Sequence, residues 1–336
     1  MKNDGRMASA RKGLKRIVRS CLPALDYGYL PFAAAAGLIL KLGRLVGFQR
    51  LRQSRETLKK IGVFPIIRHY FEPAFHPADL PVRLDAARDL PGLNLNIAAQ
   101  VDLLERLATK TPPTPFGDTP TGELEFYYGN NAFESGDACA WWAMIMYHRP
   151  RRIVEIGSGY STLIARAAID RLDHRCEHIC FEPYEEPWLE RTGATIIREP
   201  VETADTGLFE SLAEGDILFI DSSHVIRPGG DVLFEYLELL PRLRPGVLVH
   251  IHDIFTPRHY LSEWVHDEVR LWNEQYLLEA FLSMNDGYEI VLALNYLKHA
   301  HYDRMKAAFP RLTEAREPGS FYIRRVVPSP NAKAVS

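Results

Sequence analysis

The most informative segment of this chain is Arg152-Ile153-Val154-Glu155-Ile156-Gly157-Ser158-Gly159-Tyr160-Ser161-Thr162. Its first five residues are apolar apart from Arg152 and Glu155, and they predict a short buried strand. Two glycines then predict a tight turn, and a helix is expected from Ser161. Glycines let a ligand approach the backbone closely. The acid in the strand and the two glycines therefore indicate a loop that holds a nucleoside-containing cofactor.

The spacing around this turn narrows the kind of cofactor. The dinucleotide pattern G-x-G-x-x-G would need a third glycine, and Thr162 stands in its place. A second predicted strand, 178–181, ends at Glu182, which follows Gly159 by 23 residues. An acid at this point is placed to accept hydrogen bonds from both ribose hydroxyls. A lone G-x-G turn or a lone acid after a strand is common, but together they favour a nucleoside cofactor that is not a dinucleotide.

From residue 138 onward, strands alternate with helices, which is typical of a parallel sheet with crossover helices. The predicted strands are 152–156, 178–181, 195–199, 217–220, 247–251, 288–294 and 320–325, and the predicted helices are 161–172, 230–240 and 268–283. The last two strands form a hairpin-like pair. The predicted class is α/β, a doubly wound, mostly parallel, seven-stranded Rossmann-like sheet with a helical and irregular N-terminal extension. Ligands bind such sheets at the carboxyl ends of the strands.

The first 60 residues are strongly basic, although the whole chain has a formal charge of -3. They hold 14 Lys and Arg against 3 Asp and Glu. A basic arm on an acidic body predicts either an anionic partner, such as a membrane surface, or a solvated helix that keeps the chain soluble. The 14 apolar residues Tyr27–Leu40 are fewer than the ~20 that a spanning helix needs, and Pro31 interrupts them. We expect them to pack on the body or lie at a membrane interface, rather than to span or be cleaved.

Composition divides the chain into four parts. They are a basic, partly apolar arm (1–60), a proline-rich cap and substrate region (61–135), the α/β domain (136–328) and a tail (329–336). Cys176 and Cys180 have a C-x3-C spacing, but Cys180 lies inside a predicted strand and no second pair is nearby. This spacing disfavours a zinc site and predicts free thiols in a reducing cytoplasm.

Acids and histidines follow the fourth and fifth predicted strands. Asp221 comes directly after strand 217–220, and His252 and Asp253 close strand 247–251. Because the carboxyl ends of parallel strands meet at one edge of the sheet, these three side chains are predicted to bind a divalent ion together. Two carboxylates suit Mg²⁺ or Mn²⁺, while the imidazole shifts the preference towards Mn²⁺, Fe²⁺ or Zn²⁺.

Two further histidines accompany these acids. His224 lies three residues beyond Asp221 and can reach a bound substrate, and its ordinary pKa of ~6.5 suits a general base near neutral pH. His250 lies deeper in its strand, so a hydrogen-bonded core histidine is the favoured interpretation. Structural roles remain open for the other residues as well, with Asp221 as a turn cap and His224 as a loop residue.

Together these residues resemble the class I S-adenosylmethionine-dependent methyltransferases. The turn Val154–Gly159 matches the first motif of that family, and Glu182 matches its ribose-binding acid. Four segments resemble the group called methyltransferase type 24, namely 126–133, 219–224, 243–253 and 272–276. The resemblance spans residues 125–325.

The resemblance implies roles for individual residues. S-adenosylmethionine would be bound by Glu155, Gly157, Ser158, Gly159, Ser161, Glu182, Asp221 and Ser222. Metal-dependent O-methyltransferases, such as the catechol and macrocin enzymes, place acids at the same two strand ends. This implies Asp221 and Asp253 as ligands, with His252 where those enzymes carry an acid and His224 where the catechol enzymes carry a lysine base. The alternative is a metal-free enzyme in which His224 or His252 alone deprotonates the acceptor.

We therefore predict a cytoplasmic O-methyltransferase acting on a hydroxyl of a sugar, a glycan intermediate or a natural-product-like small molecule. S-adenosylmethionine is its predicted cofactor, with Mg²⁺ or another divalent metal as the optional second one, and residues 136–328 are its methyltransferase domain. Nucleic acid is disfavoured as a partner, because the body is acidic. Peripheral membrane contact is expected only through residues 1–60. Two alternatives remain: a metal-dependent oxidoreductase or hydroxylase with iron in the His/Asp/Asp cluster, and a non-catalytic, membrane-docked binding module.

Overall fold

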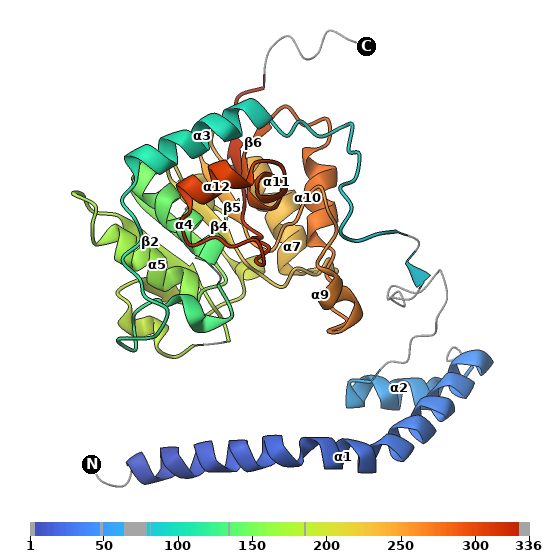
Figure 1. Ribbon diagram of the computed structural model, residues 1–336. Helices are drawn as coiled ribbons and strands as arrows, with labels where there is room; N and C mark the ends of the chain where they lie inside the picture. Colours follow the sequence, from blue (N-terminus) through green and yellow to red (C-terminus); the bar gives the residue numbers. More distant parts are fainter. Residues whose placement is uncertain are drawn as a thin grey trace, which may run out of the picture. The chain divides into compact units, whose positions relative to one another are not determined.

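The structure of the chain is a computed structural model (Figure 1), which describes residues 4–47, 50–63, 79–80, 82–133, 135–184 and 186–328. The chain divides into two units, residues 1–80 and 81–336. The predicted boundaries after residues 60 and 135 remain predictions, and the predicted tail, residues 329–336, lies outside the described residues.

Among its described residues, the N-terminal unit contains helices α1 (Asp4–Val46) and α2 (Arg52–Ile61). Helix α1 continues through Pro31, so the predicted interruption at this residue is not seen. Its segment Leu25–Val46 has 22 residues with a mean hydropathy of 1.4, and is long and apolar enough to cross a membrane by length and composition. The predicted apolar length was too short, because apolar residues continue beyond Lys41.

The second unit is built on one seven-stranded sheet with the order β3-β2-β1-β4-β5-β7-β6. The strands are β1 (Arg152–Ile156), β2 (Glu177–Phe181), β3 (Thr195–Ile197), β4 (Ile217–Ile220), β5 (Leu248–Ile251), β6 (Tyr288–Ala293) and β7 (Phe321–Arg325). Strands β1 to β5 are parallel, and β7 is antiparallel to both of its neighbours. All seven predicted strands and the predicted α/β class are confirmed.

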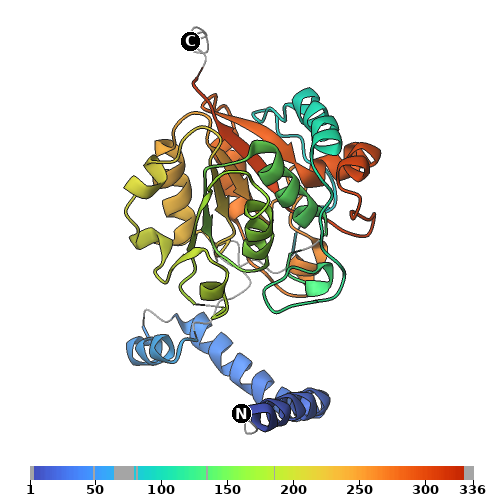
Figure 2. The same cartoon turned by 90° about the vertical axis from the view of Figure 1, so that its left-hand side faces the viewer.

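Helices cover both faces of this sheet (Figure 2). One buried cluster includes residues of α3 (Ile97–Lys110), α4 (Ser135–His148), α5 (Tyr160–Ile169), α11 (Leu294–Ala300) and α12 (Tyr302–Ala308). The other includes residues of α6 (Gly207–Glu210), α7 (Asp231–Phe234), α8 (Leu240–Arg242) and α10 (Glu274–Leu282), with a π-helical turn at Glu235–Leu239. Parallel strands that are buried on both faces need nearly continuous apolar runs, which is why these strands are readable from sequence.

Shorter elements connect these layers. They are helix α9 (Ser262–His266) and the 3₁₀ turns at Tyr128–Asn130, Leu189–Arg191 and Val201–Thr203. Helix α3, Ile97–Lys110, belongs to the predicted cap. Upstream of it, Arg88 donates to Glu279 Oε2 over 2.8 Å, and Glu279 also accepts from Thr256 Oγ1 over 2.7 Å. This buried carboxylate holds the start of the second unit against α10.

The predicted helix 268–283 is wrong in its first third, because α10 begins only at Glu274. The backbone N–H groups of Asn273 and Glu274 both donate to the carbonyl of His224, over 3.0 and 3.2 Å. The N–H groups in the first turn of a helix have no acceptor within the helix. The His224 carbonyl supplies an acceptor for the N–H groups where α10 begins. These two hydrogen bonds fix the residue at which α10 begins. They also hold the start of α10 against the loop that follows β4.

Candidate active site

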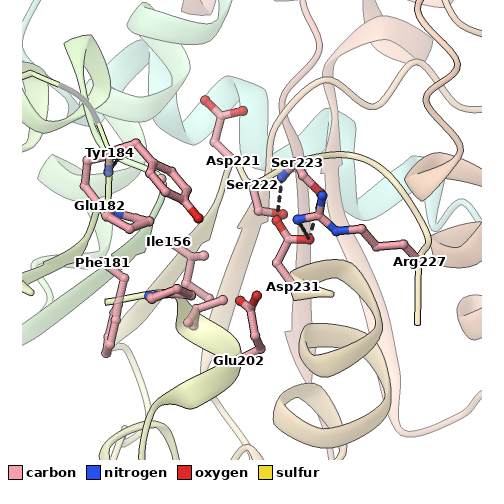
Figure 3. A pocket seen from close by; sticks show the side chains of 14 residues that line it. Ile156, Phe181, Glu182, Tyr184, Glu202, Asp221, Ser222, Ser223, Arg227 and Asp231 are labelled. Atoms are coloured by element: carbon pink, nitrogen blue, oxygen red, sulfur yellow. Dashed lines mark hydrogen bonds and ion pairs between the residues drawn. The ribbon is translucent and has the colours of Figure 1, made fainter. Parts of the chain in front are cut away.

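A cavity of about 250 Å³ lies at the carboxyl ends of β1, β2 and β4 (Figure 3). Of the eight residues predicted to hold the cofactor, four line it, namely Gly157, Glu182, Asp221 and Ser222. The other four, Glu155, Ser158, Gly159 and Ser161, are not among its lining residues. The position of the cavity is the one expected for a ligand of a doubly wound sheet.

The turn after β1 is fixed by Gly157. This residue has φ +79°, and a Cβ on it would lie 1.9 Å from the carbonyl oxygen of Asp221. No side chain fits at that distance, so glycine is required here for both space and backbone angle. Gly159 differs, since a Cβ there would meet no atom within 4 Å. It leaves open space beside the turn.

A buried carboxylate supports the turn from behind. Glu155 accepts hydrogen bonds from Ser161 Oγ over 3.2 Å and from Thr162 Oγ1 over 2.7 Å. Thr162 Oγ1 in turn accepts the N–H of Gly159 over 3.2 Å. Thr162, which occupies the position of the third dinucleotide glycine, thus links Glu155 to the turn. Glu155 is fully buried, so its role in this geometry is to position the turn, and direct cofactor contact by it stays a prediction.

Glu182 connects the second strand to the same turn. Its Oε2 accepts the N–H of Ser158 over 3.2 Å, and its Oε1 accepts the N–H of Tyr184 over 3.0 Å. These bonds hold the carboxylate at the cavity wall, where a ribose can reach it. Sequence reasoning missed three groups on the wall, Tyr184, Glu202 and the Arg227–Asp231 pair (Figure 3). Glu202 follows the third strand, which was a usable signal for the same sheet edge.

The predicted acids and histidines at the ends of β4 and β5 do come together. The distance from His252 Nδ1 is 3.3 Å to Asp221 Oδ1 and 3.5 Å to Asp253 Oδ1. His224 Nε2 lies 3.3 Å from Asp221 Oδ1 and 3.7 Å from Asp253 Oδ2. Asp221 keeps 29% of its side chain exposed, whereas the two histidines keep only 5% and 6%. The histidines are thus enclosed behind a carboxylate that reaches the cavity.

Two of these residues have an unusual backbone. His224 and Asp253 both have φ +59°, in the left-handed region that non-glycine residues rarely adopt. Such conformations are found where the surrounding structure imposes them, often at functional sites. With this backbone, the side chain of His224 contacts Asp221 and that of Asp253 contacts His252.

The carboxylates and imidazoles shift one another's pKa values. Burial opposes the charged form of His224, but hydrogen bonds to Asp221 and Glu274 outweigh it and hold the pKa of His224 well above its usual range. The pKa of His252 is also raised, since Asp253 and Asp221 outweigh its burial. Partial burial opposes the charged form of Asp221 as well, but the two imidazoles outweigh it and hold the pKa of Asp221 below the usual range. Burial raises the pKa of Asp253. The acids of the cluster therefore raise the pKa of both imidazoles.

Glu274 is the main residue of this cluster that sequence reasoning missed. Its Oε2 lies 2.7 Å from His224 Nδ1, and its Oε1 accepts from Tyr236 Oη over 2.9 Å. Trp272 covers the same imidazole, with the ring centroids 4.2 Å apart. Both residues lie in the segment 272–276 that resembles the methyltransferase group, but the overlong predicted helix gave no reason to place them beside His224.

The cluster offers oxygen and nitrogen atoms that could bind a divalent ion. Asp221, His252 and Asp253 each offer one ligand atom, and these atoms lie within 4.8 Å of one another. Both ring nitrogens of His252 are buried without a hydrogen-bond partner in the described part of the chain. Two carboxylates and an unbonded imidazole form a donor set suited to Mn²⁺, Fe²⁺ or Zn²⁺, so the three residues fit such an ion.

Other titratable groups near the sheet have structural explanations. His250 Nε2 lies 2.8 Å from Ser320 Oγ and its ring stacks on Tyr322 at 4.1 Å, which confirms it as a hydrogen-bonded core residue. Cys176 and Cys180 are buried and free, as is Cys139. The side chain of Cys21 lies outside the described ones.

Comparison with known proteins agrees with this geometry. Residues 154–254 match the Methyltransf_24 family, described as a methyltransferase domain. An uncharacterized protein of Archaeoglobus fulgidus is 34% identical over 194 residues, which cover 54% of this chain and 86% of that protein. The chain belongs to the class I S-adenosylmethionine-dependent methyltransferases, in the type 24 group.

Solved structures similar to this chain are also methyltransferases. The S-adenosylhomocysteine-bound methyltransferase PaMTH1 of Podospora anserina is 16% identical, with a TM-score of 0.35 over 68% of this chain and 88% of its own. The O-methyltransferase TomG of Streptomyces achromogenes, involved in tomaymycin synthesis and solved with S-adenosylmethionine, is 14% identical, with a TM-score of 0.35 over 72% of this chain and 92% of its own.

We expect substitution by alanine to have different effects at the two glycines of the turn. Gly157→Ala would place a methyl group on the Asp221 carbonyl, and we expect it to lower the free energy of unfolding by about 3 kcal/mol or more. Gly159→Ala meets open space, so it should leave stability within about 1 kcal/mol and weaken cofactor binding instead. Urea unfolding and calorimetric titration with S-adenosylmethionine measure the two effects. Equal stability of the two variants would contradict this account of the turn.

Proposed function

We propose that this methyltransferase transfers the methyl group of S-adenosylmethionine to a hydroxyl of a sugar, a glycan intermediate or a natural-product-like small molecule. The observation that carries the proposal is the position of Asp221. It lines the cofactor cavity and also lies 3.3 Å from both His224 and His252. A methyl donor in the cavity would therefore lie beside a cluster that can handle the proton of an acceptor hydroxyl.

The cofactor would be held by the turn and the strand ends around the cavity. Glu182 would accept the ribose hydroxyls, since its carboxylate is already fixed at the wall by two backbone N–H groups. Gly157, Ser158 and Gly159 would pass close to the cofactor, and Asp221 and Ser222 would line the cavity next to Gly157. Glu155 and Ser161 would act behind the turn.

Methyl transfer to a hydroxyl needs an acceptor aligned with the sulfonium methyl and a group that takes the proton. His224 is the proposed base, and it would accept the proton at Nε2, because Nδ1 is held by Glu274. Glu274 would then stabilise the imidazolium that forms. His252 is the proposed second base of a metal-free enzyme, since its ring nitrogens have no hydrogen-bond partner among the described residues.

The resting cluster limits this proton transfer, because Asp221 and Glu274 keep the pKa of His224 high. A divalent ion held by Asp221, His252 and Asp253 would neutralise the two carboxylates and polarise the acceptor hydroxyl. We propose Mg²⁺ or another divalent metal in this role, with Mn²⁺ the better match to the imidazole.

The proposed partners follow from the composition of the chain. The acceptor would be a small molecule or glycan selected by residues 61–135, of which 64–78, 81 and 134 lie outside the described residues. A cytoplasmic location and peripheral membrane contact through residues 1–60 complete the proposal. Membership of the methyltransferase family favours methyl transfer over the oxidoreductase and the non-catalytic binding module.

Cofactor binding is the first test. The wild-type protein should bind S-adenosylmethionine in a calorimetric titration, and Glu182→Ala should weaken binding about tenfold or more through the loss of a charge-assisted hydrogen bond. Glu199→Ala is the matched control, because Glu199 is exposed and does not line the cavity. Folded wild-type protein that shows no binding at millimolar cofactor would refute the proposed activity.

The base is tested by His224→Ala. We expect methyl transfer to fall about 100-fold or more, the range found for general bases, while cofactor binding is kept. The measurement is transfer of radiolabelled methyl groups to a panel of sugars and polyhydroxylated natural products. His174→Ala serves as the control, since His174 lies near Pro150, before β1, at the other end of the strands. Wild-type turnover in His224→Ala would remove this residue from the mechanism.

The metal site is tested by Mn²⁺ binding. Asp253→Asn and His252→Ala should each weaken Mn²⁺ binding about tenfold or more in a calorimetric titration. Asp267→Asn alters an exposed carboxylate outside the cluster and should bind Mn²⁺ like the wild type. If chelation leaves methyl transfer unchanged, the enzyme is metal-free and His252 returns as a candidate base.

A further inference from the structure

The middle of α1 is apolar on every side. Residues 27–40 contain no charged side chain, and fourteen residues make almost four helical turns of 3.6 residues each. Its large side chains are exposed, including Tyr27 at 80%, Phe32 at 72% and Ile39 at 69%. None of the segment Leu25–Val46 is buried among the described residues. A helix that is apolar all round needs an apolar environment, which a solvated helix lacks.

Basic residues flank this segment equally on its two sides. Residues 1–24 contain seven Lys and Arg, and residues 41–60 contain another seven. Anionic lipid headgroups attract such clusters by about 1 kcal/mol for each cation near the surface. This charge complementarity identifies a bilayer with anionic lipids as the partner, and Lys41 and Arg44 can extend to its headgroups.

The equal number of basic residues on the two flanks also bears on how the helix lies in the bilayer. A spanning helix is oriented by an excess of Lys and Arg on one side, and here the two flanks are equal. The uncharged run 27–40 is about 21 Å long at 1.5 Å per residue, which is shorter than a hydrocarbon core of about 30 Å. The longer segment Leu25–Val46 has the length to cross the core, but it includes Asp26, Lys41 and Arg44. Pro31 leaves the carbonyl of Tyr27 without its helical donor, and α1 bends along its length (Figure 1). A bent helix with two basic ends can keep both ends at one face.

We propose that α1 is a monotopic membrane anchor. Its apolar segment 27–40 inserts into one leaflet of an anionic bilayer, and both basic flanks remain at the same face. The proposal concerns the arm alone: it replaces a peripheral contact of residues 1–60 by insertion, and it is independent of the proposed methyl acceptor.

Insertion is tested by flotation of the full-length protein with vesicles. Protein should float with vesicles of phosphatidylcholine mixed with phosphatidylglycerol and remain bound in high salt. The Leu30→Glu/Ile39→Glu double variant should reduce the bound fraction about tenfold or more. Leu237→Glu is the control, because Leu237 is 61% exposed but belongs to the second unit. Retained binding of S-adenosylmethionine shows that the double variant is folded.

The position of the flanks is tested by cysteine labelling in a Cys21→Ser background. Ser9→Cys and Ser54→Cys mark the two flanks, and each protein is expressed in a bacterial host and treated with a membrane-impermeant maleimide. We expect both cysteines to be protected in intact spheroplasts and to react after lysis. Reaction of one of them in intact spheroplasts would show a spanning helix and overturn the monotopic anchor. Equal flotation of the double variant and the wild type, or a lipid-free oligomer that does not float, would overturn insertion.

Discussion

The contact between Gly157 and the backbone of Asp221 is the constraint on which the rest of the site depends. It joins the turn after β1 to the end of β4 so closely that a Cβ on Gly157 would lie 1.9 Å from the Asp221 carbonyl oxygen. A further hydrogen bond of 2.8 Å runs from the Asp221 N–H to the carbonyl of Ile156. One residue is thereby held at the cofactor turn by its backbone, while its side chain reaches the histidines.

The electrostatic balance of the cluster follows from that placement. Asp221 and Asp253 raise the pKa of both buried imidazoles, and Glu274 also raises the pKa of His224. A cluster of this kind is stable only while its negative charges are matched, either by protons on the histidines or by a metal cation. The same balance explains why the proposed base and the proposed metal ligands share one small volume. Because of this balance, a cation held by the carboxylates would also change the pKa of His224.

Much of the fold could be predicted from the sequence, because strands buried on both faces require unbroken apolar runs. Asp221, His224, His252 and Asp253 could be placed together for a related reason, since the ends of neighbouring parallel strands meet. Glu274 could not, because it comes from a helix that begins 50 residues after His224 and whose start is set by the His224 carbonyl. Glu155 was expected at the cofactor, but the sequence could not show that Ser161 and Thr162 would bond to it from behind the turn.

Asp221 forms a wall that the cofactor cavity shares with the acid–base cluster. A crystal structure of the full-length protein with S-adenosylhomocysteine would test this shared wall. We expect the ribose hydroxyls to contact the carboxylate of Glu182 and the sulfur to face the side of the cavity formed by Asp221, with His224 behind it. Binding of the ligand with its sulfur directed away from Asp221, or outside the cavity after β1, would contradict it.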